Sequence, residues 1–435
     1  MFGWEQILRT FHFSKRMSKI LLLPLGTTGD LLPMIWIGRQ MSARGHQVAL
    51  LWLAPYRELV EQAGLEFVAL DDEGREEPIR NSSYWRPHAA LKMTYDYAGF
   101  WTIMSVNAVV KWVEINGLPD LLMAPIMNFT APILRAKLGV PLITTHMTTL
   151  QLMSAHEVPL GVPCARLLRI LPLLLRRTIL NLVAPYDHLA KPYLRKCCAE
   201  HGVRLPYWLR EWFYSPDGSL VLFPSWFDKP QMDWPVNTLQ WDFPLEDLAD
   251  ASELDPALAA FLDAGDSPVV FRFGNDPTRS RGFYEVAAEL TARIGGRAVF
   301  VTRDGDPIPD ALPASIFVTT FVPFSRLLIR SCVCVHYGGI GTVSQCFAAG
   351  LPQIVVPLVF DQFDNACYVE RLGAGLKMDL HQWSVSKALP LLRRCVEEDD
   401  IRRNATLCAE RLRNRKPATQ LAEWIEAKMT APRAA

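Results

Sequence analysis

The residues with the clearest chemical potential lie in the stretch 332–375. An apolar run ends at His336, and a glycine-rich turn then leads through Gly339 and Gly341 to Thr342 and a helix of small residues. A strand, a turn and a helix in this order leave unpaired backbone N–H groups at the start of the helix, where anions bind. The stretch therefore predicts a site for a phosphate or a diphosphate.

Two further groups of polar residues accompany this turn. Asp361 and Gln362 follow the next apolar run, and their side chains could bind the hydroxyls of a sugar ring. Far upstream, the turn 26–30 ends in Asp30 at the predicted start of another helix. A carboxylate there either caps the helix or acts as a general base. The set as a whole fits a sugar bound to a diphosphate.

The elements that position these residues have the pattern of an α/β protein. Apolar runs alternate with helical patterns, which is typical of parallel sheets, and 435 residues are too many for one ordinary core. We predict a first domain at 18–223, a linker at 224–250, a second domain at 251–415, and a C-terminal helix within 416–435 that returns to the first domain. Because ligands of parallel sheets bind at the carboxyl ends of the strands, the two domains should face each other across a cleft.

Composition excludes some functions. Lys and Arg number 45, as do Asp and Glu, so the chain lacks the basic excess of a nucleic-acid-binding protein. Nine cysteines without a paired spacing indicate reduced thiols and a cytoplasmic protein. Asp304-Gly305-Asp306 has the form of a metal-binding DxD, but its context favours a solvated turn, so we expect no metal.

Two segments raise the question of membrane contact. Residues 1–17 mix aromatic and basic side chains, and we interpret them as a tail, as the product of a start codon placed before a true start at Met17, or as a weak surface anchor. No segment has the pattern of a transmembrane helix. The arginine-containing segment 167–183 is either a basic amphipathic helix on a bilayer, giving peripheral contact with the inner face of the membrane, or a buried helix with snorkelling arginines.

The chain resembles the family 1 glycosyltransferases, which have the GT-B fold. The family patterns HHGGxGT, GxP, DQxxNA and GTxGDxxP correspond here to 336–342, 350–352, 361–366 and 26–33. The segments PSWFDKPQMDWP and VPFSRLL look like the bacterial branch that contains rhamnolipid rhamnosyltransferases and sterol or macrolide glycosyltransferases. The match extends from about residue 18 to 420.

The resemblance implies a role for each matching residue. It assigns the donor diphosphate to His336, Gly339, Gly341, Thr342 and Asn275, the donor sugar to Asp361 and Gln362, the nucleotide base to Phe321, and the general base to Asp30. Two departures from the family pattern stand out. Tyr337 replaces a second histidine, and residues 124–125 offer no carboxylate to orient Asp30.

These roles imply an inverting, metal-independent glycosyltransferase that needs no cofactor. The donor would be a nucleotide sugar of the dTDP-rhamnose or UDP-glucose type, and the acceptor a hydroxyl on a hydrophobic molecule such as a lipid or a small natural product. Two alternatives keep the same fold, namely a nucleotide-sugar epimerase and a non-catalytic nucleotide-sugar-binding partner protein. An epimerase would need further acid and base groups, and a non-catalytic partner would be expected to lack Asp30 or His336.

Overall fold

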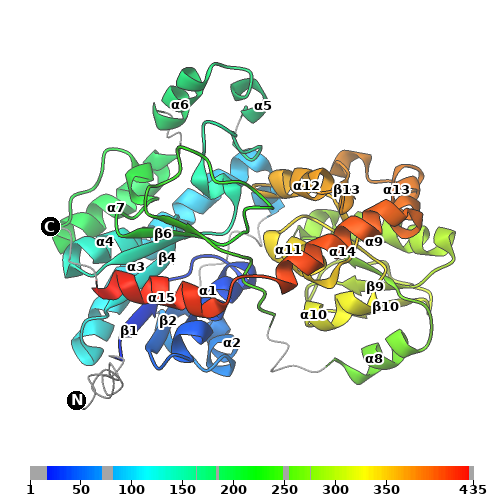
Figure 1. Ribbon diagram of the computed structural model, residues 1–435, viewed down its shortest axis with the longest axis horizontal. Coiled ribbons are helices and arrows are strands. Elements are labelled where there is room, and N and C mark those ends of the chain that lie inside the picture. The colour runs from blue at the N-terminus through cyan, green and yellow to red at the C-terminus, as the bar shows by residue number, and fades with distance from the viewer. Residues whose placement is uncertain are drawn as a thin grey trace, which may run out of the picture.

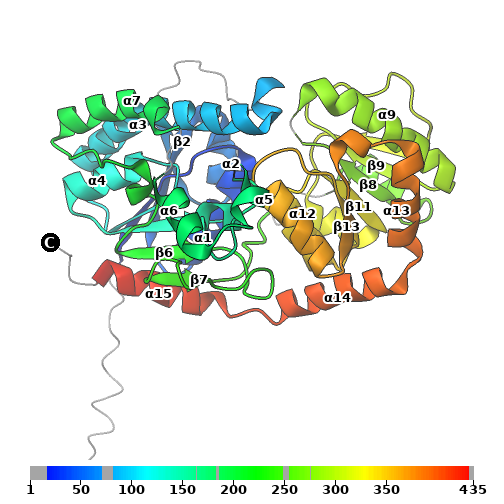
Figure 2. The same cartoon turned by 90° about the horizontal axis from the view of Figure 1, so that it is seen from above.

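The computed structural model describes residues 17–70, 82–162, 164–182, 186–247, 254–274 and 276–430. In these residues two parallel sheets form two α/β domains that stand side by side, with helices packed on the faces of each sheet (Figures 1 and 2). This is the two-domain architecture that the sequence predicts. Residues 1–16 of the predicted tail lie outside the described part.

The N-terminal domain is built on a seven-stranded sheet of order β3-β2-β1-β4-β5-β6-β7. Several of its strands are almost continuously apolar, and in β2 every residue after the first is buried. This pattern belongs to strands that are covered on both faces. The strands are β1 (Lys19–Leu22), β2 (Gln47–Leu53), β3 (Glu66–Leu70), β4 (Leu121–Pro125), β5 (Leu142–His146), β6 (Gly218–Val221) and β7 (Thr238–Gln240).

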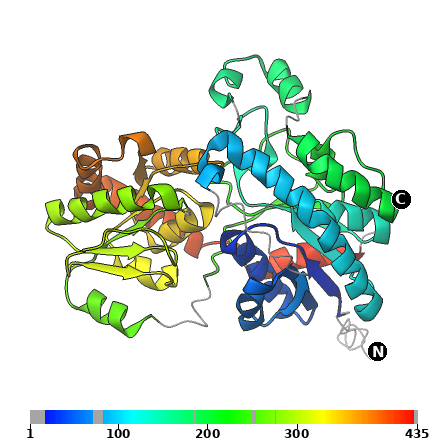
Figure 3. The ribbon, with the colours of Figure 1, turned by 180° about the vertical axis from the view of Figure 1, so that it is seen from behind.

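Helices pack against both faces of this sheet. The long helix α3 lies along α7 on one side of the domain (Figure 3). Gly99 allows this close packing, because a Cβ atom at that position would lie 2.8 Å from the Cα atom of Ala190. The helices are α1 (Thr28–Ser42), α2 (Arg57–Gln62), α3 (Pro87–Asn116), α4 (Thr130–Leu138), α5 (Ala165–Leu168), α6 (Leu173–Leu182) and α7 (Asp187–His201).

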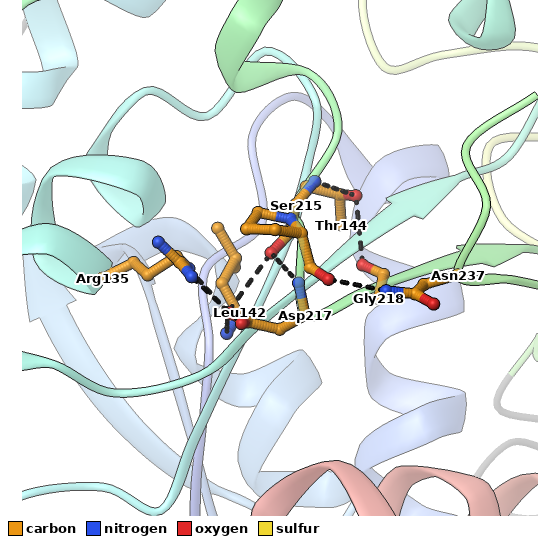
Figure 4. Close-up of polar contacts among 8 residues, drawn as sticks. Arg135, Leu142, Thr144, Ser215, Asp217, Gly218 and Asn237 are labelled. Atoms are coloured by element: carbon orange, nitrogen blue, oxygen red, sulfur yellow. Dashed lines mark hydrogen bonds and ion pairs between the residues drawn. The ribbon is translucent and has the colours of Figure 1, made fainter. Parts of the chain in front are cut away.

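Asp217 connects the amino-terminal ends of strands β5 and β6 (Figure 4). Its carboxylate accepts hydrogen bonds from the Arg135 guanidinium at 2.6 and 3.0 Å and from the backbone N–H of Leu142 at 3.0 Å. Asp217 directly precedes β6, and Leu142 begins β5, so the contacts align the two strands where they begin.

The C-terminal domain is built on a six-stranded sheet of order β10-β9-β8-β11-β12-β13. Its strands are β8 (Val269–Arg272), β9 (Ala298–Val301), β10 (Ile316–Thr319), β11 (Val333–His336), β12 (Gln353–Val355) and β13 (Gly375–Lys377). Its helices are α8 (Pro256–Asp263), α9 (Pro277–Ile294), α10 (Phe324–Leu327), α11 (Ile340–Ala349), α12 (Gln362–Arg371), α13 (Val385–Glu397) and α14 (Asp399–Arg413).

The chain passes between the domains in both directions. The stretch predicted as a linker contains β7, which pairs with β6, so the N-terminal domain extends to about Gln240. A three-residue strand among prolines and aromatic residues has no alternating pattern from which it could be predicted. After α14 the chain returns, and α15 (Ala418–Thr430) places Leu421 and Ile425 in the core of the N-terminal domain. Trp85, which precedes α3, packs instead in the core of the C-terminal domain.

Candidate active site

The glycine-rich turn connects β11 to α11 at the carboxyl end of the C-terminal sheet. Gly338 has a φ of +92°, and a Cβ atom there would lie 2.7 Å from Cγ1 of Val355, so only glycine fits. Gly339 is the N-cap of α11, Gly341 is exposed, and Thr342 is largely buried in the first turn. The first N–H groups of α11 are therefore available to an anion at the domain junction.

His336 lies beneath this turn and holds it in place. The ring is fully buried, its Nδ1 accepts a hydrogen bond from the Gly338 N–H at 3.0 Å, and its Nε2 is 2.9 Å from Oε1 of Gln353. Burial lowers the pKa of His336 to about 4, so the ring is neutral at pH 7. Both ring nitrogens are thus engaged within the protein. The direct contact with a diphosphate that the resemblance implies stays a prediction.

Arg272 supplies a positive charge that the sequence analysis missed. It ends β8 directly beside His336 in the sheet, and its guanidinium lies over the ring of Phe324, 5.4 Å from the centroid. Its Nε is buried without a hydrogen-bond partner, and no carboxylate of the described residues forms an ion pair with it. Two residues further on, Gly274 packs against Tyr337, whose hydroxyl lies close to Gly339. A guanidinium left unpaired at the carboxyl end of a parallel sheet is a place where a ligand's negative charge would be stabilised.

Asp361 and Gln362 stand at the start of α12 and are tied to the glycine-rich turn. Oδ2 of Asp361 accepts a hydrogen bond from Asn365 at 2.7 Å, and the same Asn365 amide donates to the carbonyl of Gly338 at 2.9 Å. Oε1 of Gln362 accepts the N–H groups of Leu358 and Val359, which fixes the preceding loop. The two loops that the sequence analysis selected therefore form one connected unit.

Asp361 has a pKa raised by burial, to which the charge of Asp30 also contributes. Asp361 retains some exposed surface, yet burial at the junction raises its pKa to about 7, and the charges of Asp364 and Asp30 add to the increase. Asp30 belongs to the N-terminal domain and Asp361 to the C-terminal domain. Because the charge of Asp30 contributes to the pKa of Asp361, the two carboxylates lie in the same part of the junction between the domains.

Asp30 also has the capping role that the sequence left open. Its Oδ2 accepts the backbone N–H of Thr27 at 2.9 Å at the start of α1. The side chain folds back over Gly26, where a Cβ atom would lie only 2.1 Å from that oxygen. The same oxygen lies 3.5 Å from the Thr27 hydroxyl. Capping through Oδ2 does not by itself exclude contact with a ligand, because a carboxylate has two oxygens and several acceptor positions.

The remaining predicted residues lie in different surroundings. Phe321 is 59% exposed in the loop between β10 and α10, so it is not part of the core and its ring is open for stacking. Asn275 lies outside the described residues. The DxD segment forms a turn in which Asp306 accepts a hydrogen bond from the N–H of Arg303 at 2.9 Å. Asp304 is exposed in the same turn.

In the described part of the chain, one group of side chains could form a metal site, and it consists of Cys334, His336 and Cys346. All three are buried. A metal would have to displace a hydrogen bond of His336. Burial and the neighbouring Cys334 raise the pKa of the Cys346 thiol, which opposes the thiolate form that a metal requires. The group therefore fits the interior of the domain better than a metal centre.

A loop from the N-terminal domain closes over the start of α12. The carboxylate of Asp364 accepts the N–H groups of Leu160 at 2.8 Å and Gly161 at 3.3 Å, and it forms an ion pair with Arg169 at 3.7 Å. Gly161 lies so near the carbonyl of Phe360 that a Cβ atom would approach it to 2.6 Å. These contacts join the N-terminal domain to the helix that follows Asp361.

Comparison with known proteins finds glycosyltransferases that resemble this chain. Residues 295–427 match the family model of the erythromycin biosynthesis protein CIII-like C-terminal domain. The chain is 24% identical to 4'-demethylrebeccamycin synthase of Lentzea aerocolonigenes over 433 residues, which is 94% of this chain and 99% of that protein. The chain is thus similar to glycosyltransferases of natural products along most of its length.

Solved structures agree on the fold. The glycotransferase of kitacinnamycin superimposes with a TM-score of 0.73 at 19% identity, covering 95% of this chain and 100% of that one. The glycosyltransferase VinC, solved in complex with dTDP, superimposes with a TM-score of 0.70 at 17% identity over 95% of this chain and 100% of that one. The chain therefore has the two-domain GT-B fold of these structures.

Proposed function

We propose that the enzyme transfers a sugar from a nucleoside diphosphate to a hydroxyl of a hydrophobic acceptor, a lipid or a small natural product, with inversion at the anomeric carbon and without a metal. The donor is of the dTDP-rhamnose or UDP-glucose type. The observation that carries the proposal is that Asp361, whose pKa is raised by burial and in part by Asp30 of the other domain, is tied through Asn365 to the glycine-rich turn at the start of α11.

The C-terminal domain provides the groups that a departing diphosphate needs. The first N–H groups of α11 and the Arg272 guanidinium are fixed before the ligand arrives, so they can stabilise the developing charge without rearranging. His336 keeps the turn in shape through its bond to Gly338, and Phe321 offers a face to the nucleotide base. That VinC was solved with dTDP supports a nucleotide donor for this fold.

The N-terminal domain provides the base. When the acceptor hydroxyl attacks the anomeric carbon, the bond from that carbon to the diphosphate breaks, and the hydroxyl proton passes to a carboxylate oxygen of Asp30. Attack on the face opposite the leaving group inverts the configuration. Asp361, with the amide of Gln362, binds the sugar hydroxyls and orients the carbon toward Asp30.

The substitution Asp30→Asn tests this assignment. Asparagine retains an oxygen that can accept the Thr27 N–H, so α1 keeps its cap while the base is lost. We expect transfer to fall by roughly 100- to 10,000-fold, with nucleotide binding unchanged, because removal of a general base affects the chemical step. Thr27→Ala is the matched control, since it alters the same helix start but leaves the carboxylate. Full turnover by Asp30→Asn, measured as nucleotide release with a lipid extract as acceptor, would reject the role of Asp30.

A further inference from the structure

Helices α5 and α6 form a small unit that projects from the N-terminal domain (Figures 1 and 3). The unit has a core of its own, which consists of Ala155, Val158, Ala165, Leu168 and Leu180. The two helices are therefore held in position by apolar packing. Leu171 and Ile179 pack against this core, whereas several other large apolar side chains of the unit are exposed.

The outward side chains form an exposed apolar surface, which we call the apolar tip. Ile170 is 77% exposed and Leu174 is 79% exposed, and the other members are Leu167, Leu173 and Leu175. Single exposed aliphatic residues are common on protein surfaces, but a contiguous group of this kind marks a site of association. The sequence left open whether this segment is buried or lies on a bilayer, and the structure shows one buried face and one exposed face.

The charges around the apolar tip identify its partner. Residues 164–182 contain four arginines and no acidic residue. Arg166 and Arg177 are exposed beside the tip, whereas Arg176 is used internally, donating to the carbonyl of Leu171 at 2.7 Å. Aliphatic side chains flanked by cations suit an anionic bilayer, where leucines enter the acyl boundary and guanidinium groups meet the lipid phosphates. A second copy of the chain fits less well, because it would bring like charges together.

The position of the tip connects it to the active site. The loop that leads into α5 places the N–H groups of Leu160 and Gly161 on Asp364, and Arg169 pairs with the same carboxylate. Asp364 stands one helical turn from Asp361. A bilayer in contact with the tip would thus lie on the side of the molecule where this loop meets the start of α12.

We propose that the apolar tip docks the enzyme on an anionic lipid bilayer, from which a membrane-dissolved acceptor reaches the junction of the two domains. This inference rests on the proposed function for the choice of acceptor. The docking itself depends only on the exposed side chains of α5 and α6 and on the absence of acidic residues between them.

Vesicle co-sedimentation of the full chain tests the docking. The vesicles contain either phosphatidylcholine alone or phosphatidylcholine with phosphatidylglycerol. We expect binding to the anionic vesicles, weakened by salt, and its loss in the double variant Ile170→Glu, Leu174→Glu. The matched control is Ile115→Glu, Ile329→Glu, because these isoleucines are 83% and 68% exposed on α3 and after α10. It should bind like the wild type.

A second variant measures the electrostatic part. Arg166→Gln, Arg177→Gln should weaken binding to anionic vesicles by roughly fivefold per arginine and leave binding to neutral vesicles unchanged. Because all these side chains are exposed, each variant should unfold at the wild-type temperature.

Three outcomes would overturn the inference. They are equal vesicle binding by the tip variant and the control, no binding by the wild type, and a sedimentation-velocity dimer that the tip substitutions dissociate, which would assign the tip to a second copy of the chain. Stabilisation of the protein by nucleotide sugars provides a separate readout. If it persists while vesicle binding is absent, the docking is wrong and the proposed function stands. If it is absent while docking occurs, the proposed function fails and the docking stands.

Discussion

The substitution Arg272→Met should change the affinity for the donor without lowering the stability of the folded protein. Methionine keeps an unbranched stem of similar length over Phe324 but removes the guanidinium. In the free protein that group has a buried Nε without a partner, and the described residues offer it no carboxylate. Its removal should leave the melting temperature unchanged or raise it, since an uncompensated buried polar group destabilises the folded state.

Ligand binding should change in the opposite direction. A hydrogen bond to a charged group contributes about 1.5–3 kcal/mol, which corresponds to a loss of roughly 10- to 150-fold in affinity for the donor. The affinities for inorganic phosphate and for the nucleoside diphosphate should also fall in this variant, because the contact is to the phosphates and not to the sugar. Arg272→Lys should restore part of the affinity, as it keeps the charge without the planar pair of donors.

The assay is titration calorimetry with nucleoside diphosphate, together with thermal unfolding in the presence and absence of the same ligand. Arg281→Met is the matched control, because Arg281 lies in the same domain and pairs at the surface with Glu285 and Asp310. It should leave the affinity unchanged. The reasoning is refuted if Arg272→Met lowers the melting temperature of the free protein by several degrees while the affinity for the diphosphate stays at the wild-type value.

Four further predictions concern the same site. Burial raises the pKa of Asp361 from its ordinary 3.8 to about 7. The folded state therefore binds the extra proton between these values, so the free energy of unfolding should fall as pH rises through that window. Asp361→Asn should lack this slope in denaturant titrations, and an identical slope would contradict the pKa. Phe321→Ala should weaken nucleotide binding by about fivefold, or about 1 kcal/mol, without a change in melting temperature, and a large loss of stability would place the ring in the core. Asp364→Ala leaves two loop amides unpaired and should cost about 1–3 kcal/mol in denaturant unfolding, more than Asp364→Asn, which retains an acceptor oxygen. Gly338→Ala should lower both stability and donor affinity, since its φ of +92° and its contact with β12 exclude a side chain, and wild-type values for both would disprove the close approach.

The sequence predicted the elements around the glycine-rich turn because several local signals agree there. The apolar run before His336 is β11, and the small-residue segment after Gly339 is α11. The strand, the turn and the helix each depend on residues close in the chain, so their positions follow from local chemistry. The same holds for the first helix after the turn at 26–30.

Other parts of the site depend on partners far away in the sequence. Arg272 looks like any arginine at the end of a strand until the fold shows that no acidic residue of the described chain reaches it. Asp364 belongs to the DQxxNA pattern, but its partners at Leu160 and Gly161 lie about 200 positions upstream. Asp364 is unusual because it is an acidic residue buried on a helix. Burial becomes visible only in the structure, so the sequence carries no sign of these contacts.

The two passages of the chain between the domains restrict how the enzyme can move. One passage follows β7, and the other lies between α14 and α15, which is anchored to the N-terminal domain by the Arg44–Glu426 ion pair at 2.7 Å. A body attached to its neighbour at two points can swing about the line that joins them, but it can scarcely twist or slide. After each opening of the two domains, the two connections would therefore bring Asp30 back to the same position relative to the C-terminal domain.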